Sequence, residues 1–352
     1  MIFDKLILSY ILISFALIYI GINLLKKYNF YDKPNESSKD HLKPTITALG
    51  IPIVIAFMCC VAITYYQELT IFSNFKAQLN PSRLWFLFVS TAIIFLISIY
   101  DDKKSINPYI KLALQFTIIY LSLTTIQIDY QEIFISNYTY VPLKVITIIV
   151  VYLWIFYLNA TNFIDGVDGN LILFILSNSF LFLFLSYYFN YNLISTFMII
   201  LIIINLIAFI FNRFPAKAFL GDCGSNFYGF LYGWLFIIFS IEGFFIEILI
   251  LNYIYFGDIL STWLSMIKKK QNIFVSHNNF LFKTIYKNYN KKNNYYLSVI
   301  FLNLILFFAV LSIIKFDLTL INKLIILLVL YIPTPYIREY ILKKTKNFYE
   351  LD

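Results

Sequence analysis

The sequence predicts an all-α, polytopic membrane helical bundle, and two observations support this prediction. The chain of 352 residues is 61% hydrophobic and has a mean hydropathy of +0.78. Only 13% of its residues are charged, whereas a typical soluble domain has about 25%. Because one helical bundle can occupy the whole chain, we expect a single integral-membrane domain over residues 1–352.

Apolar runs that could cross a bilayer recur along the whole chain. A spanning helix needs about 20 mostly apolar residues, and eleven runs meet or approach that length. In order, they are Leu6–Leu25, Ile46–Tyr65, Leu84–Tyr100, Ile110–Ile126, Leu143–Leu158, Leu171–Tyr188, Leu193–Phe211, Phe227–Phe239, Phe244–Met266, Tyr296–Ile314 and Leu320–Tyr336. The first run is not followed by a small-residue cleavage site, so we do not interpret it as a signal peptide.

The basic residues predict the orientation of the bundle. If the loop after the first run is cytoplasmic and the sides alternate, cytoplasmic segments hold 21 of the 27 lysines and arginines. Positive charge gathers in cytoplasmic loops, so we expect a periplasmic N-terminus and a cytoplasmic C-terminus. The net charge of +8 then belongs to a cytoplasmic surface facing lipid rather than to a nucleic-acid partner.

The few cysteines and histidines exclude two classes of protein. Three cysteines, two of them adjacent in an apolar run, cannot form a disulfide framework. Together with only two histidines, they also argue against a structural zinc site, which needs four nitrogen or sulfur ligands.

Three acidic clusters occupy the short gaps between apolar runs, all on the predicted cytoplasmic side. Asp101 and Asp102 end the third run. Adjacent carboxylates repel each other, which favours a cation between them or a proton on one. By itself the pair could equally be a polar boundary to a membrane helix.

The second cluster lies between the fifth and sixth runs and combines amides, carboxylates and glycines. It reads Asn159-Ala-Thr-Asn162-Phe-Ile-Asp165-Gly-Val-Asp168-Gly. If its start is helical, the spacing puts Asn162 and Asp165 on one face, and the glycines allow close approach to a phosphate. A calcium loop is excluded because its twelfth position is Leu176 rather than Glu. An acidic surface turn is the alternative.

The third cluster precedes the eighth run and reads Lys217-Ala-Phe-Leu-Gly221-Asp222-Cys-Gly224-Ser225. Small residues leading into a helix N-terminus suit an anion, since free N–H groups point outward there. The segment lacks both the P-loop and the dinucleotide-binding patterns. Oxygen-rich clusters with glycines at one membrane surface predict a Mg²⁺ and phosphate site, and a solvated loop is the alternative.

Read in order, these segments resemble the polyprenyl-phosphate N-acetylhexosamine-1-phosphate transferases, glycosyltransferase family four. The runs that match are Asp101-Asp102 with Lys111 and Gln115, the Asn159–Gly169 cluster, and Phe214-Pro-Ala-Lys-Ala-Phe-Leu-Gly-Asp222-Cys-Gly-Ser225. The resemblance implies that undecaprenyl phosphate attacks a UDP-N-acetylhexosamine with the help of Mg²⁺, or alternatively Mn²⁺, on the cytoplasmic face of the bacterial inner membrane. Membrane lipid is a further expected partner, and a homodimer stays open.

The resemblance also implies roles for individual residues. We expect catalytic groups at Asp101, Asp102 and Asp165, and metal ligands at Asn162, Asp165 and Asp222. We expect substrate-binding groups at Lys111, Asn159, Asp168, Lys217 and His277.

Departures from the family pattern concern the donor sugar. The triple histidine typical of the peptidoglycan branch is replaced by Ser276-His277-Asn278-Asn279-Phe280. This loop is more similar to the O-antigen-initiating branch, which implies an N-acetylhexosamine donor, and the arginine and second histidine of that branch are missing. Phe280 and Phe282 predict an apolar wall that would suit a 6-deoxy sugar. A lipid-linked sugar transporter or a non-catalytic protein that binds the lipid carrier remain alternatives, although transporters usually carry charges at mid-membrane.

Overall fold

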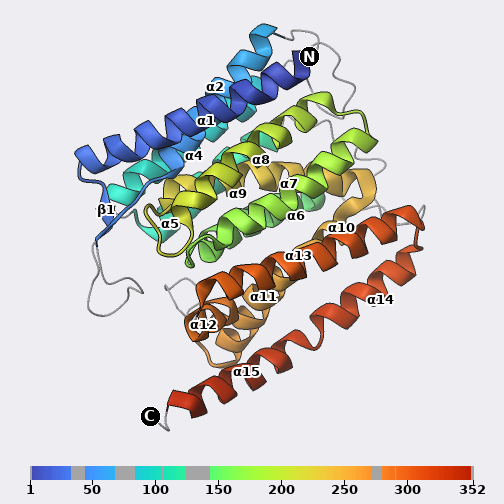
Figure 1. Cartoon of the computed structure of the whole chain (residues 1–352). Coiled ribbons are helices and arrows are strands. Elements are labelled where there is room, and N and C mark those ends of the chain that lie inside the picture. Colours follow the sequence, from blue (N-terminus) through green and yellow to red (C-terminus); the bar gives the residue numbers. More distant parts are fainter. Residues whose placement is uncertain are drawn as a thin grey trace. The chain divides into compact units, whose positions relative to one another are not determined.

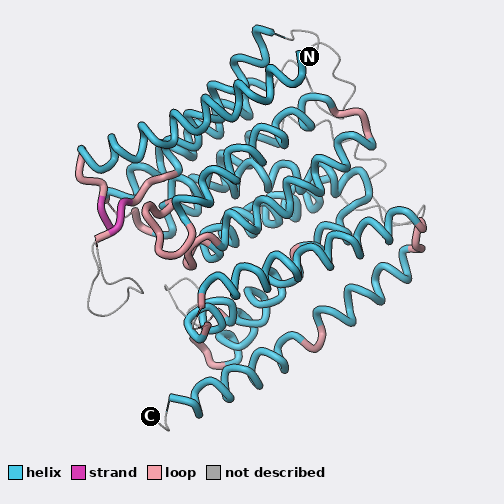
Figure 2. Tube along the Cα trace, in the orientation of Figure 1, coloured by secondary structure: helices cyan, strands magenta, loops and turns pink. Residues whose placement is uncertain are grey.

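The computed structural model describes residues 2–32, 44–67, 84–104, 106–123, 143–271, 280–289 and 291–349. Helices make up nearly all of this part of the chain (Figures 1 and 2), which confirms the predicted all-α class. The chain divides into two compact units, Met1–Ile241 and Glu242–Asp352. That it forms a single domain over residues 1–352 stays a prediction.

Unit 1 contains the helices from the first eight predicted runs. They are α1 (Ile2–Lys27), α2 (Gly50–Gln67), α4 (Leu84–Lys103), α5 (Pro108–Ser122), α6 (Leu143–Ile164), α7 (Asn170–Tyr188), α8 (Asn192–Asn212) and α9 (Gly221–Phe239). Two short antiparallel strands, β1 (Tyr31–Asp32) and β2 (Thr45–Ile46), lie between α1 and α2. A single bridge from Ile46 to Ala218 brings β2 beside the segment that precedes α9.

Helix α9 is the central element of unit 1. It packs against α2, α4, α6 and α7, and all its residues from Cys223 to Phe239 are buried. Glycines on α9 permit the close approach of α6: a Cβ at Gly229 would lie 2.3 Å from the Thr161 hydroxyl, and one at Gly233 2.4 Å from the Trp154 ring. Small residues allow helix backbones to approach in this way inside membranes.

Unit 2 contains the remaining helices. They are α10 (Phe245–Leu251), α11 (Tyr253–Lys268), α12 (Leu281–Asn288), α13 (Lys292–Lys315), α14 (Leu320–Tyr331) and α15 (Thr334–Tyr349). Two ion pairs join its first two helices to its last two. Lys323 Nζ on α14 lies 2.6 Å from Glu247 Oε1 on α10, and Arg338 Nε on α15 lies 3.5 Å from Asp258 Oδ1 on α11. Glu247, Asp258 and Arg338 are all buried.

The helix boundaries differ from the predicted runs at several positions. The second run begins at Ile46, whereas α2 begins at Gly50. The eleventh run, Leu320–Tyr336, is broken after Tyr331 into α14 and α15. Helix α9 begins at Gly221, six residues before the predicted Phe227, because the polar Gly-Asp-Cys-Gly-Ser-Asn segment forms its first turns. The ninth predicted run, Phe244–Met266, is broken at Asn252 into α10 and α11.

Membrane crossing is supported in part of the chain. Eight of the described helices are long and apolar enough to cross a membrane by length and composition, and Gly50–Tyr66 is a shorter apolar helix. The predicted total of eleven and the predicted orientation stay predictions.

Candidate active site

The loop before α9 is held in position by the segment that follows β2. Phe219 donates its N–H to the Ile46 carbonyl at 2.7 Å, and Leu49 N and Gly50 N donate to the Phe219 and Leu220 carbonyls at 2.9 and 3.0 Å. These bonds fix the backbone immediately before Gly221. Gly221 has a φ of +72°, a conformation that glycine adopts without strain.

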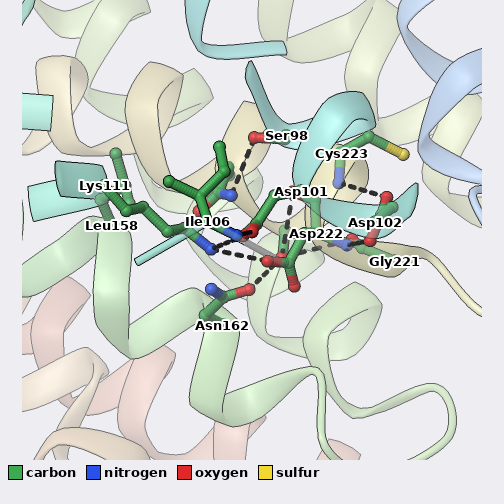
Figure 3. Close-up of polar contacts among 12 residues, drawn as sticks. Ser98, Asp101, Asp102, Ile106, Lys111, Leu158, Asn162, Gly221, Asp222 and Cys223 are labelled. Carbon is green, nitrogen blue, oxygen red and sulfur yellow. Dashed lines mark hydrogen bonds and ion pairs between the residues drawn. The ribbon is translucent and has the colours of Figure 1, made fainter. Parts of the chain in front are cut away.

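The ammonium group of Lys111 forms ion pairs with two carboxylates in unit 1. Lys111 Nζ, on α5, lies 2.7 Å from Asp101 Oδ2, at the end of α4, and 2.6 Å from Asp222 Oδ2, in the first turn of α9 (Figure 3). The side chains of Lys111, Asp101 and Asp222 are 18%, 10% and 36% exposed. Asp222 is therefore the more accessible of the two carboxylates.

The adjacent Asp101 and Asp102 have different partners, which removes the need for one cation between them. Asp101 also accepts the Ile106 N–H, at 2.6 Å. Asp102 accepts the backbone N–H groups of Asp222 and Cys223, at 2.9 and 3.2 Å. In this structure the first turn of α9 therefore donates to the Asp102 carboxylate, and the binding of a substrate phosphate there stays a prediction.

Asn162, near the end of α6, is hydrogen-bonded to α9. The Ser225 hydroxyl donates to Asn162 Oδ1 at 2.5 Å. The neighbouring Thr161 hydroxyl lies 2.7 Å from the Leu158 carbonyl and 3.0 Å from the Ser225 carbonyl. These contacts, together with the close approach at Gly229, hold the amide of Asn162 against Ser225, which lies three residues after Asp222 on α9.

The other predicted residues of the second cluster lie on α6 and in the turn that follows it. Asn159 donates to the Ile155 carbonyl one turn earlier on α6. Asp165 and Asp168 lie in the turn after α6 and are partly exposed. This turn is connected to the loop before α9 because Asn212 accepts the Gly169 N–H at 2.9 Å and donates to the Ala218 carbonyl at 3.0 Å.

Lys217, a predicted substrate-binding residue, does not take part in these ion pairs. Lys217 is exposed on the loop before α9, with its Nζ 5.9 Å from the centre of the Phe211 ring. His277 lies outside the described residues. Phe280 and Phe282 are buried and stack on each other with ring centres 5.3 Å apart, so they give no support to an apolar wall that faces a sugar.

Sequence reasoning did not single out the residues that connect these helices. Asn226 donates to Ser98 Oγ at 2.9 Å, and both are buried. Asn212 is likewise buried. Polar side chains inside apolar helices are a signal that could have identified them, because such residues usually pair with one another.

The donor chemistry of the centre fits Mg²⁺. Mg²⁺ usually binds through one or two carboxylates and completes its shell with water and substrate phosphates. The accessible carboxylate of Asp222 and the nearby amide oxygen of Asn162 meet that requirement. No three His, Cys, Asp or Glu side chains in the described part of the chain are grouped so that they could hold a metal ion, so a metal here would also need oxygens from Asn162, water or substrate.

One segment of the chain is similar to a known family. Residues 84–240 match the model of glycosyl transferase family 4. This segment runs from the start of α4 to just beyond the end of α9, and it contains every predicted site residue except His277. No curated protein matches the chain. The family-4 match and the apolar helices support a transferase activity in a membrane protein.

Proposed function

We propose that this chain transfers an N-acetylhexosamine 1-phosphate from a UDP-sugar to undecaprenyl phosphate. An oxygen of the lipid phosphate forms a bond to the β-phosphorus of the donor. The bond from that phosphorus to the oxygen it shares with the α-phosphate breaks, so UMP leaves and undecaprenyl-pyrophosphoryl-sugar is formed. The reaction would begin O-antigen or another cell-envelope glycan on the cytoplasmic face of the inner membrane.

The observation that carries this proposal is the position of Lys111 between Asp101 and Asp222. Phosphoryl transfer needs little covalent chemistry from the protein and depends mainly on positioning and on stabilising charge. A phosphate that reaches the accessible Asp222 side chain would be next to the Lys111 ammonium. The exposed Lys217 on the adjoining loop would add a second positive charge for the donor.

Asp222 and Asn162, with Asp165 from the adjoining turn, would hold Mg²⁺ or Mn²⁺. When bound, the metal ion would offset the repulsion between two anionic substrates. Asp101, held by Lys111 and the Ile106 N–H, would lie beside the lipid phosphate. That phosphate is largely dianionic at pH 7, since its second pKa is about 6, so a general base is not required. A two-step route through an aspartate nucleophile is the alternative.

Release of UMP by the purified protein tests the proposal. With undecaprenyl phosphate, Mg²⁺ and a panel of UDP-N-acetylhexosamines, we expect UMP from at least one donor. EDTA should abolish the release, and Asp222→Asn should lower it by about a hundredfold or more, since hard-cation sites depend on carboxylate charge. Asp317→Asn is the matched control, because Asp317 is exposed in the turn after α13.

The other outcomes are equally informative. UMP release at the full rate in EDTA would contradict the role of the metal. If the folded wild-type protein released no UMP from any donor, the transporter and the non-catalytic lipid-binding protein would become the better explanations.

A further inference from the structure

We propose that Asp102 is a positioning residue: its carboxylate holds the first turn of α9, and so fixes Asp222, without contacting either substrate. The kinetic part of this inference rests on the proposed function, whereas the structural part does not. It assigns different tasks to two neighbouring aspartates that the sequence alone presents as a pair.

The bonding of Asp102 supports this role directly. Its two oxygens accept one backbone N–H each, from Asp222 at 2.9 Å and from Cys223 at 3.2 Å. The first N–H groups of a helix have no partner within the helix, and an acceptor side chain that satisfies them stabilises it. A negative charge at this end is also favoured by the helix dipole. The unusual feature is that the acceptor comes from another helix, α4, 120 residues earlier in the chain.

Gly221 gives a second, independent observation. A Cβ at this position would lie 3.1 Å from Asp102 Oδ2, tighter than an ordinary van der Waals contact. Gly221 also has a φ of +72°, so its backbone and its missing side chain both suit the approach of the Asp102 carboxylate. The Asp102 carboxylate, the Ala48 backbone nitrogen and the Thr47 hydroxyl all lie this close, so the junction before α9 accommodates the carboxylate only because residue 221 has no side chain.

A further bond holds the same two helices one turn deeper. Asn226 Nδ2 donates to Ser98 Oγ at 2.9 Å, and both side chains are buried. Because Ser98 and Asp102 lie four residues apart on α4, as do Asn226 and Asp222 on α9, the helices are joined at two successive turns. Loss of the hydrogen bonds to Asp102 would release the turn that carries Asp222 and leave the bond between Asn226 and Ser98 intact.

Asp101 provides the contrast within the same dipeptide. Its carboxylate binds the Lys111 ammonium at 2.7 Å, which in turn binds Asp222, so Asp101 belongs to the charged centre. Asp101→Asn is therefore the matched control for Asp102→Asn: the two changes are chemically identical and occur at adjacent positions, but only one removes an acceptor from α9.

The first measurement uses the protein without substrate. Cys223 is buried at the N–H that Asp102 accepts, so its alkylation by N-ethylmaleimide reports opening of this turn. In a Cys59→Ala/Cys60→Ala background, Asp102→Asn should raise the labelling rate about five- to thirtyfold, the range expected for losing a helix cap. Asp102→Ala should raise it at least as much, and Asp101→Asn should leave it within about twofold of the parent.

The second measurement separates turnover from binding. Asp102→Asn keeps one acceptor oxygen, so we expect kcat to fall about ten- to hundredfold, as for a displaced catalytic group, with KM for the UDP-sugar within about twofold. Asp101→Asn should lower kcat further. If Asp102→Ala does not fold, the isosteric Asp102→Asn still carries both measurements.

Two results would overturn the proposal. The first is an inactive Asp102→Asn protein with unchanged Cys223 labelling, which would make Asp102 a direct participant in the reaction. The second is equal labelling in the Asp101→Asn and Asp102→Asn proteins. If the wild-type protein released no UMP, the proposed function would fail while the labelling experiment still decided the role of Asp102.

Discussion

Lys111, on α5, joins carboxylates from two other helices, α4 and α9, and its charge determines how closely these carboxylates can approach each other. Its Nζ lies 2.7 Å from Asp101 Oδ2 and 2.6 Å from Asp222 Oδ2. Without the ammonium, two anions would face each other in a partly buried position, where charges interact more strongly than in water. The lysine is thus required both for the shape of the centre and for the phosphate that it would receive.

Replacing Lys111 should consequently impair turnover strongly. We expect Lys111→Gln to lower kcat by about 10²–10³, the usual effect of removing one group that stabilises developing charge. Lys111→Arg should not restore it, because a planar guanidinium differs in shape from an ammonium that bridges two carboxylates. The rate of UMP release measures both. Lys104→Gln is the control, since Lys104 is nearby and exposed; equal losses in the Lys104 and Lys111 variants would contradict this role.

The residue types of this centre could be predicted from the sequence, but their partners could not. Oxygen-rich clusters on one predicted side of the membrane indicated a phosphate site, and Asp101, Lys111 and Asp222 do meet in the structure. That Asp102 would bind the backbone of Asp222 depends on how α4 packs on α9. This packing cannot be predicted from the position of Asp102 next to Asp101 or from the spacing of residues along the chain.

The contact between α6 and α9 places Asn162 beside the turn that carries Asp222. A Cβ at Gly229 would lie 2.3 Å from Thr161 Oγ1 and 2.7 Å from the Leu158 Cα. Backbone atoms cannot move aside as a flexible side chain can. The separation of the two helices, and with it the Ser225–Asn162 hydrogen bond at 2.5 Å, depends on this glycine.

Gly229→Ala should therefore destabilise unit 1 by about 1–3 kcal/mol, the typical cost of overpacking, despite the better helix propensity of alanine. Thermal unfolding in detergent should show a transition lowered by several degrees. Gly257→Ala is the matched control, because its added Cβ would meet only side-chain atoms at 3.3 Å or more. An equal decrease in both variants would show that close approach at Gly229 is not the cause.

In unit 2, Asp258 connects three helices. It forms an ion pair with Arg338 on α15 at 3.5 Å and accepts the Phe282 N–H of α12 at 3.1 Å. Removing one partner of a buried ion pair typically costs about 3–5 kcal/mol, because a charge stays buried without compensation. We expect Arg338→Met to lower the unfolding temperature clearly, and Arg338→Met with Asp258→Asn to recover part of the loss. A purely additive double variant would argue against coupling.

Hydropathy located the helices well and their ends less well. Each of the eleven apolar runs overlaps a helix in the described residues, because burial in lipid requires internal hydrogen bonds for every backbone group. The predicted start of α9 is too late because the first turns of this helix are polar. The break at Asn252 has no hydropathy signal, because the chain remains apolar on both sides of it.

At the scale of the whole molecule, the acidic clusters of unit 1 lie at one end of its bundle. The end of α4 and the start of α5 meet the end of α6 and the start of α9 around Lys111 and Asp222 (Figure 3). This agrees with loops that share one side of a membrane. The predicted topology assigns 21 of the 27 basic residues to the same side as these clusters, which predicts that this side is the cytoplasmic one, where nucleotide sugars are made.

The two ends of α7 provide a test of that orientation. Gly166, in the turn before α7, and Tyr188, its last residue, are both exposed. Asn170, the first residue of α7, is a poorer position for a cysteine probe, because it is buried and a thiol there would be shielded from the reagent on either side of the membrane. In a protein without Cys59, Cys60 and Cys223, a single cysteine at position 188 should react with an impermeant thiol reagent in intact spheroplasts. A cysteine at position 166 should react only in inside-out vesicles. The reverse pattern would invert the orientation. It would then remove the site from cytoplasmic UDP-sugars and so contradict the proposed reaction. Labelling of both positions in intact spheroplasts would mean that α7 does not cross the membrane.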